Sequence, residues 1–359
     1  MGFFGRKRAP SVPHPRKEPR FDGPLTLERL EQIFQDCVDF TKRPVSLGEG
    51  GACTLTLCYL SGMVKMERVS DYVLRPLAQD EALARCGTPR QAMDRMKDGA
   101  LYNLSAEERT RLDAAVFDLV NGCCLLLFPW ESSVLSLNVG TEEKRSISSP
   151  SNETVLKGSR DAFVESLRTN TSIVRRHLKA PELRIREQVV GRQSVTSVDI
   201  LYIEGLTNPH LVEQVAAQLA DIDIDAVLAT GNIEEYIVPA ARTAFPLVQY
   251  TERSDRFCAG LAEGRVGILI DGLPLGYLAP GVLGDFLQAP QDKSESWLLA
   301  SALTLLRYLC MLGTLLLPAL YVAMVTFHQE MIPTRLALSI IAAKQDVPFR
   351  SVFEVIVLL

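Results

Sequence analysis

The stretch YLCMLGTLLLPALYVAMVTF, residues 308–327, contains no Asp, Glu, Lys, Arg or His. Twenty helical residues at a rise of about 1.5 Å each cross the hydrocarbon core of a bilayer, which is about 30 Å thick. The alternative is a buried core helix. However, Gly313 and Pro318 lie inside the stretch, and membrane helices accept an interior proline more readily than soluble helices do. We therefore predict a transmembrane helix at about residues 308–327.

The charged residues around this segment do not decide its orientation. Lys293 and Arg307 precede it, and Arg335, Lys344 and Arg350 follow it. Because the positive-inside rule compares Lys and Arg on the two sides, a nearly balanced count gives no direction. Residues 1–20 contain no apolar core of the kind that a signal peptide needs. We therefore expect the N-terminal region to be cytosolic.

A polar group ends the predicted span. His328, Gln329 and Glu330 follow Phe327 directly, and Pro333 comes three residues later. One interpretation is a solvated helix end. The other is that the three side chains face a partner subunit or a water-filled path, because polar groups at membrane depth need protein or water partners. Together with the helix break expected at Pro318, they are candidate gating or interface residues.

Composition places the chain between soluble and membrane proteins. Its 359 residues are 47% hydrophobic and 23% charged, and the mean hydropathy is +0.10, which fits a mixed protein of at least two units. The net charge of -5 gives no electrostatic reason to expect nucleic acid, whose phosphates favour clustered Lys and Arg. We expect no nucleic-acid partner.

Residues that could carry chemistry are sparse. None of the eight cysteines has the C-x-x-C spacing of zinc or redox sites, and the four histidines form no pair at ligand spacing. Asp221, Asp223 and Asp225 alternate as in a calcium loop, but Ala226 stands where glycine is needed and Asn232 where the closing Glu belongs. We predict no catalytic residue, no cofactor and no metal, and unpaired cysteines suit a reducing compartment.

The first 22 residues form a predicted flexible tail that is rich in Lys, Arg and Pro. A solvated tail is one interpretation. Attraction to anionic lipid is the other, because a polybasic segment gains about 1 kcal/mol per cation near such a surface.

Residues 23–148 are predicted to form a first α/β subdomain. The pattern favours a helix over residues 26–40 with Thr26 as its N-cap, a strand over 52–60, and a helical segment over 69–83 that Pro76 divides. A further helix is expected over 105–121, followed by a hairpin of strands 123–128 and 132–139. The polar, Ser-rich stretch 140–152 contains the expected domain boundary.

Residues 149–293 are predicted to form a second α/β subdomain. A helix is expected over 159–178. Its buried face includes Phe163 and Leu167, and its solvent-exposed face carries Arg168, Arg175 and Arg176. Asn208 and Pro209 are typical of an N-cap and first-turn proline. The other expected elements are strands 183–190 and 195–203, a helix to residue 220, apolar runs 226–228, 247–250 and 266–270, and a helical segment 253–263.

The fold class that follows is α/β (α+β): a two-part soluble N-terminal region followed by a transmembrane α-helix. In the membrane region, residues 294–359, the apolar segment 336–343 is too short to span a bilayer. The run 352–359 resembles the start of a further helix. We therefore expect a membrane region that is truncated at Leu359.

Several sequence blocks, in this order, resemble the A-subunit family of spore germination receptors, the GerA family, from about Val155 onward. The most specific is residues 317–334, LPALYVAMVTFHQEMIPT, which is similar to the family's first membrane helix and its exit. The other blocks are residues 157–163 (KGSRDAF), 165–170, 203–205, 221–237, 250–253 (YTER) and 263–272, which begins with EGRV and ends with DG.

The resemblance implies a subunit of a nutrient-sensing complex in the spore inner membrane. Its implied partners are a transporter-like B subunit, a lipoprotein C subunit, further A subunits in a homo-oligomer, and membrane lipid. A subunits of this family are thought to oligomerise into an ion-conducting channel, with germinant binding attributed mainly to the B subunit. The resemblance thus implies that a nutrient signal leads to ion release.

Two other classes of function compete with a receptor or channel subunit. One is a membrane-anchored cytosolic scaffold or ligand-binding module without conductance, and the other is an enzyme, which only the α/β architecture favours. Arg253 and Arg265 are further candidates for interface residues, although structural ion pairs explain them equally well.

Overall fold

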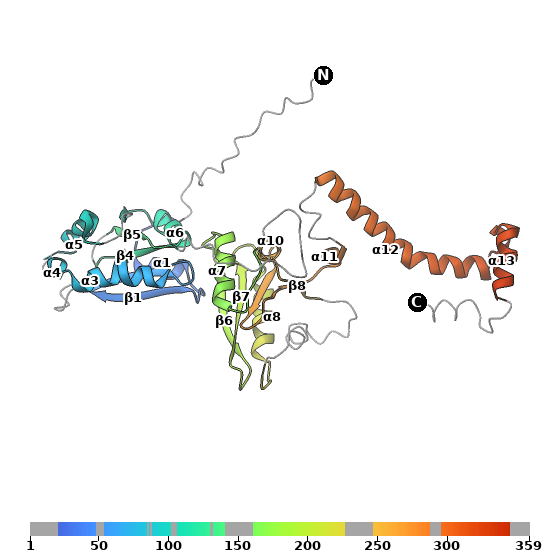
Figure 1. The fold of residues 1–359 in the computed structure, drawn as a ribbon, viewed down its shortest axis with the longest axis horizontal. Coiled ribbons are helices and arrows are strands. Elements are labelled where there is room, and N and C mark those ends of the chain that lie inside the picture. Colours follow the sequence, from blue (N-terminus) through green and yellow to red (C-terminus); the bar gives the residue numbers. More distant parts are fainter. Residues whose placement is uncertain are drawn as a thin grey trace, which may run out of the picture. The chain divides into compact units, whose positions relative to one another are not determined.

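The computed structural model describes residues 21–47, 54–84, 86, 88–101, 106–129, 132–140, 161–226, 247–287 and 296–344. The chain divides into two compact units: unit 1 is residues 1–154 with 159–281, and unit 2 is residues 155–158 with 282–359. Unit 1 contains two five-stranded antiparallel sheets (Figure 1). We call the described parts around them lobe 1 (residues 21–140) and lobe 2 (residues 161–281).

The sheet of lobe 1 has the strand order β1-β2-β4-β5-β3. Its strands are β1 (Phe40–Ser46), β2 (Thr54–Leu60), β3 (Ala106–Arg109), β4 (Cys123–Leu127) and β5 (Val134–Asn138). Side chains alternate between the two faces, so Leu57 and Tyr59 pack on one face of β2 whereas Cys58 and Leu60 pack on the other. The predicted hairpin is confirmed, because β4 and β5 pair antiparallel.

Helices bury both faces of this sheet. One face packs against α1 (Leu27–Ile33) and α6 (Leu112–Val120). The other packs against six short helical segments: α2 (Met66–Val69), η1 (Ser70–Leu74), α3 (Arg75–Gln79), α4 (Glu81–Ala84), α5 (Pro89–Arg95) and η2 (Met96–Ala100). Lobe 1 is therefore a three-layer unit with two apolar cores.

Two helix predictions in lobe 1 need correction. Thr26 caps α1 as predicted, with its hydroxyl accepting from Arg29 N, but the helix ends at Ile33 instead of residue 40. Residues 37 and 38 bond to lobe 2 instead. The prediction of a helix over 105–121 was wrong in its first part. Ala106–Arg109 forms the edge strand β3, and only Leu112–Val120 is helical. Pairing with β5 outweighs the helical preference of these residues.

The sheet of lobe 2 has the order β6-β7-β9-β10-β8. Its strands are β6 (Leu183–Val190), β7 (Thr196–Ile203), β8 (Gln249–Thr251), β9 (Val266–Ile270) and β10 (Gly276–Ala279). One face packs against α7 (Leu167–His177) and α10 (Ser254–Ala262), and the other against α8 (Pro209–Ala220). Asn208 caps α8 with Pro209 at its first turn, as predicted.

Two parts of the prediction for residues 159–178 were wrong: the start of the helix and the side of it that was expected to face solvent. Residues 161–166 are not helical, and α7 begins at Leu167. Ala162 forms an isolated bridge with Arg253, which holds this segment extended. Arg168 is exposed, but Arg175 is 1% exposed, so α7 is covered on the side where we expected water.

The described part of unit 2 contains α11 (Leu283–Leu287), α12 (Trp297–Thr326), the 3-10 turn η4 (Gln329–Met331) and α13 (Thr334–Lys344). Helix α12 is long and apolar enough to cross a membrane, and none of its residues is buried. It starts eleven residues before the predicted start and bends along its length (Figure 1). Pro318 lies inside it and cannot donate to the carbonyl of Thr314.

Some sequence predictions lie outside the described residues. These are most of the basic tail (residues 1–20), the boundary stretch 141–152, the apolar residues 227 and 228, and the further helix expected over 352–359.

Candidate functional site

The junction between the two lobes begins where α1 ends. The backbone of Asp36 adopts a φ of 59°, which turns the chain toward lobe 2. Cys37 then bridges Ile185 in parallel register, and Val38 N donates to Ile185 O at 3.0 Å. The segment thus extends the sheet of lobe 2 at its outermost strand, β6.

A buried ion pair closes the junction from the other side. Arg175 of α7 donates from Nε to Asp39 Oδ2 at 2.8 Å and from Nη2 to Asp39 Oδ1 at 3.0 Å. Arg175 and Asp39 are 1% and 3% exposed. Burial alone would lower the pKa of Arg175, but the Asp39 carboxylate reverses that effect and the pKa is raised. Arg175 therefore stays charged although it is buried.

Arg184 makes a second connection between the lobes. Its Nη1 donates to the carbonyl oxygen of Ile33, the last residue of α1, which satisfies an otherwise open helix end. Its Nε donates to Glu204 at 3.0 Å within lobe 2. Cys37 Sγ lies between the two arginines, 3.5 Å from Arg175 Nη2 and 3.8 Å from Arg184 Nη1. Side chains far apart in sequence thus form one polar cluster.

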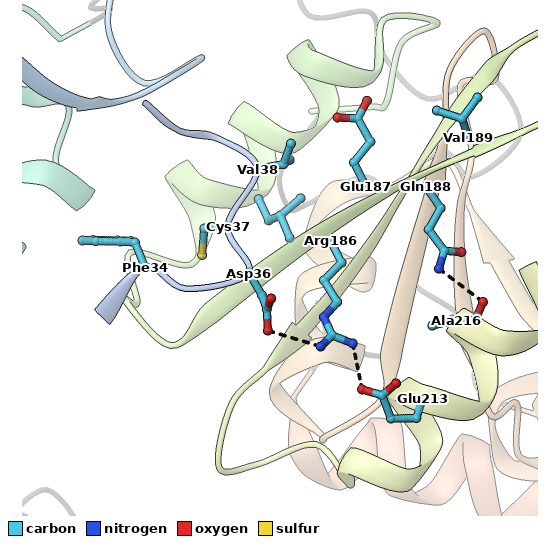
Figure 2. A pocket seen from close by; sticks show the side chains of 11 residues that line it. Phe34, Asp36, Cys37, Val38, Arg186, Glu187, Gln188, Val189, Glu213 and Ala216 are labelled. Atoms are coloured by element: carbon cyan, nitrogen blue, oxygen red, sulfur yellow. Dashed lines mark hydrogen bonds and ion pairs between the residues drawn. The ribbon is translucent and has the colours of Figure 1, made fainter. Parts of the chain in front are cut away.

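A groove of about 740 Å³ opens beside this cluster, along the outer edge of β6, next to the point where Cys37 bridges Ile185 (Figure 2). Arg186 points from β6 between two carboxylates and donates to Asp36 at 3.2 Å and to Glu213 at 2.8 Å. The apolar side chains of Val38 and Val189 are exposed beside it. The remaining lining residues are Phe34, Cys37, Ile185, Glu187, Gln188 and Ala216. The groove combines the outer strand of a sheet, exposed apolar side chains and paired charges, so it suits recognition better than bond-making chemistry.

One buried carboxylate lies on the α7 face of the lobe 2 sheet. Asp199 of β7 is 0% exposed, and neither of its oxygens has a hydrogen-bond partner. Arg168 Nη1 is 3.6 Å from Asp199 Oδ2, and Glu187, which faces Asp199 across the strands, accepts from Arg168 at 2.7 Å. Burial raises the pKa of Asp199 to about 7 despite the attraction of Arg168. This carboxyl therefore titrates near neutral pH.

Two of the sequence blocks that carry the family resemblance, residues 157–163 and 250–253, meet around residues 161 and 253. Phe163 N donates to Glu252 O at 2.8 Å, and Ser254 Oγ donates to Asp161 O at 3.0 Å. His177 Nε2 is 3.2 Å from Ser254 Oγ and 3.6 Å from an Asp161 carboxylate oxygen. This group differs from a nucleophilic triad, because Ser254 is fully buried and its hydroxyl bonds to a carbonyl. Its evident role is to join two segments of lobe 2.

Arg253 and Arg265 flank α10 at opposite ends, so the structure does not bring them into one site. Arg253 is buried and binds Asp255 through Nε and Nη2 at 3.0 and 2.6 Å. Arg265 binds Gln249 at 3.2 Å and Glu263 at 2.8 Å. From the sequence, each arginine was interpreted either as an interface residue or as a member of a structural ion pair. In the structure both form ion pairs.

The other four candidate residues lie in unit 2. Pro318 is within α12, and His328 follows the end of that helix, with its N–H bonded to Ala323 O at 3.3 Å. Gln329 and Glu330 are in η4, and the side chains of His328 and Glu330 are exposed. The polar exit is therefore a short turn between α12 and α13.

The junction residues Asp39, Arg175 and Arg184 were not predicted from the sequence. A charged residue on a strand or an amphipathic helix is normally solvated, so their burial depends on the contact between the lobes. Within the described part of the chain, no group of three His, Cys, Asp or Glu side chains is placed to hold a metal ion.

Comparison with known proteins gives consistent matches. Residues 28–359 match the family model described as Bacillus/Clostridium GerA spore germination protein. Spore germination protein KA of Bacillus subtilis is 34% identical over 88% of this chain and 57% of its own length. Spore germination protein GerLA of Bacillus cereus is 32% identical over 89% of this chain and 64% of its own length. The uncharacterized membrane protein YfkQ of Bacillus subtilis is 33% identical over 92% of this chain and 63% of its own length. The chain spans about three fifths of the length of these curated relatives.

A solved structure is also similar. It is the N-terminal domain of the A subunit of the Bacillus megaterium spore germinant receptor GerK3, with a TM-score of 0.58 and 26% identity. The similarity covers 74% of this chain and 99% of that one.

Proposed function

Because the chain belongs to the Bacillus/Clostridium GerA spore germination protein family, we propose that it acts as the A subunit of a spore germinant receptor. In this proposal, it couples nutrient sensing to ion release across the spore inner membrane as part of an oligomeric channel. The observation that carries the proposal is the combination of a family match that continues through α12 with the similarity of the preceding region to an A-subunit N-terminal domain.

The proposed partners are a transporter-like B subunit, a lipoprotein C subunit and further copies of the A subunit. Unit 1 would be cytosolic and α12 would cross the inner membrane. No covalent step is needed. A nutrient that the receptor complex binds more tightly in its open state shifts the population from the closed to the open state.

Two features of unit 2 support a role for the helix exit. Pro318 removes a backbone hydrogen bond inside α12, and such a position allows a membrane helix to bend. The exposed carboxylate of Glu330 follows the helix within four residues, where it could attract cations or pair with a neighbouring subunit.

The test is nutrient-triggered potassium release from spores in which the natural gene is replaced by the wild type, Glu330→Ala or Pro318→Ala, at matched protein levels. Slower or absent release in both variants would support gating or conduction at this exit. Met331→Ala is the matched control, because Met331 lies in the same turn and is also exposed, and it should release normally.

Normal release by Glu330→Ala and Pro318→Ala would favour the second candidate, a membrane-anchored scaffold or ligand-binding module that conducts nothing. The groove at the lobe junction is the observation that favours this alternative.

A further inference from the structure

Helix α11 packs against α12 at one level along its length. Arg307 Nη1 donates to the carbonyl oxygen of Leu287, the last residue of α11, at 3.2 Å. A Cβ placed on Gly284 would lie 3.4 Å from the Tyr308 hydroxyl. A guanidinium at the carbonyl end of a helix satisfies an open acceptor and suits the negative end of the helix dipole. The contact therefore fixes α11 beside residues 307 and 308.

The side of α11 away from this contact is apolar and exposed. Val282, Leu283 and Phe286 have exposed fractions of 49%, 54% and 49%. At about 100° per residue, they lie within an arc of about 100°. The Asp285 carboxylate instead accepts from Val282 N at 3.0 Å, so it closes its own turn. The result is a small apolar face that the described part of unit 2 does not cover.

Arg307 indicates the depth of this face. It is the only charged residue of α12, and the helix from Tyr308 to Thr326 has none. Those 19 residues span about 28 Å, close to the thickness of the hydrocarbon core. A charged side chain within the core is costly, so the border of the hydrocarbon lies at Arg307. The contact with Leu287 then places α11 at the same border.

We propose that α11 is an interfacial helix: its Leu283 and Phe286, with Val282 directly before it, insert into the boundary between headgroups and acyl chains of the bilayer that α12 crosses. A short helix with one apolar face suits this layer. Lipid is the occupant because the part of α12 beside Arg307 also exposes apolar side chains, such as Leu306 and Leu309, at the same level of the helix. The inference rests on the membrane placement in the proposed function and adds a second contact with the bilayer.

The experiment uses the whole chain in phospholipid vesicles with a single tryptophan as reporter. The two natural tryptophans, Trp130 and Trp297, are replaced by Phe, and Phe286→Trp introduces the reporter. The expected result is blue-shifted emission that is quenched most by lipids brominated near the ester end of the acyl chain. Leu283→Trp places the reporter on the same face and replaces Phe286→Trp if that variant does not fold.

Leu316→Trp in the same background is the matched control, since Leu316 is 54% exposed on α12 beyond Arg307. Lipids brominated deep in the chain should quench it most. If only the Leu316 reporter is quenched, α11 is not interfacial and the inference is wrong, but α12 still crosses the membrane. Blue-shifted but unquenched emission at position 286 means that protein covers the face, which also overturns it. If neither reporter is quenched, the membrane placement itself is wrong.

Discussion

Arg175 of α7 and Asp39 of the α1–β1 connection form a buried two-point ion pair, although 136 residues separate them in the sequence. The guanidinium belongs to lobe 2 and the carboxylate to lobe 1. Taking both charges out of water is costly, so the pair adds little net stability compared with apolar residues. Its effect is instead geometric, because the fork of the guanidinium matches the carboxylate in one relative orientation of the two groups.

Removing one partner should therefore be far worse than removing both. We expect Arg175→Met to lower the free energy of unfolding by about 3–5 kcal/mol, because Asp39 is left as an unpaired buried charge. Chemical denaturation of the purified protein measures this loss. Asp39→Asn combined with Arg175→Met should cost clearly less than the sum of the single changes.

Arg192→Met is the control for that substitution. Arg192 pairs with Asp223 at 2.7 Å, but both side chains are about 70% exposed, and surface pairs contribute about 0–1 kcal/mol. Equal losses for Arg175→Met and Arg192→Met would contradict a structural role for the buried pair.

Much of the architecture could be predicted from local pattern. The N-caps at Thr26 and Asn208 follow from residue chemistry close in sequence, as does the apolar helix around Pro318. The strands β6 and β7 were also predicted at nearly their observed bounds. Each of these signals is contained within one element.

The errors occurred where distant contacts decide the local structure. The segment around Cys37 has helical spacing of apolar residues, but it bonds to β6. Ala162 is extended because it pairs with Arg253. Arg175 appeared solvated because an isolated helix gives no sign of the lobe that covers it. The candidate site at the junction could not be predicted for the same reason, since it exists only when both lobes are folded.

The buried carboxyl of Asp199 gives the stability of the protein a pH dependence. Burial raises its pKa from 3.8 to about 7, so the folded state holds a proton that the unfolded state has released. The stability from this group is fully present below pH 4 and is lost as the pH rises toward 7. The contribution of Asp199 to the free energy of unfolding should fall by about 1.4 kcal/mol per pH unit across that window.

Asp199→Asn should remove this slope, because the amide is neutral at every pH. Unfolding by denaturant at pH 5 and pH 8 measures the difference. The charged groups around this site are Arg168, Glu187, Asp39 and Asp271, and they remain in the variant. Asp223→Asn, at an exposed position, should leave the slope as in the wild type, and an unchanged slope in Asp199→Asn would show that Asp199 is ionised throughout.

Gly276 of β10 passes close to two aromatic rings. A Cβ at this position would lie 2.6 Å from Phe257 Cδ2 and 2.8 Å from Phe163 Cε2. The two rings pack edge to face, with centroids 5.3 Å apart, so neither can move without losing the other contact. We expect Gly276→Ala to cost about 1–3 kcal/mol through overpacking, measured as a lower denaturation midpoint. Adding Phe257→Leu should recover part of the loss if crowding is the cause, whereas a further additive loss would point to another origin.

The cysteines should differ sharply in reactivity. Burial raises the pKa of Cys58 and of Cys258 to about 12, and because the thiolate is the reactive form, both should resist alkylation in the folded protein. Cys86 is only partly buried and should react first among these three. Iodoacetamide labelling at pH 8, read by peptide mass spectrometry with and without denaturant, measures the order. In denaturant all three should react at similar rates, and early labelling of Cys58 in the native protein would mean that the sheet of lobe 1 opens far more readily than its packing indicates.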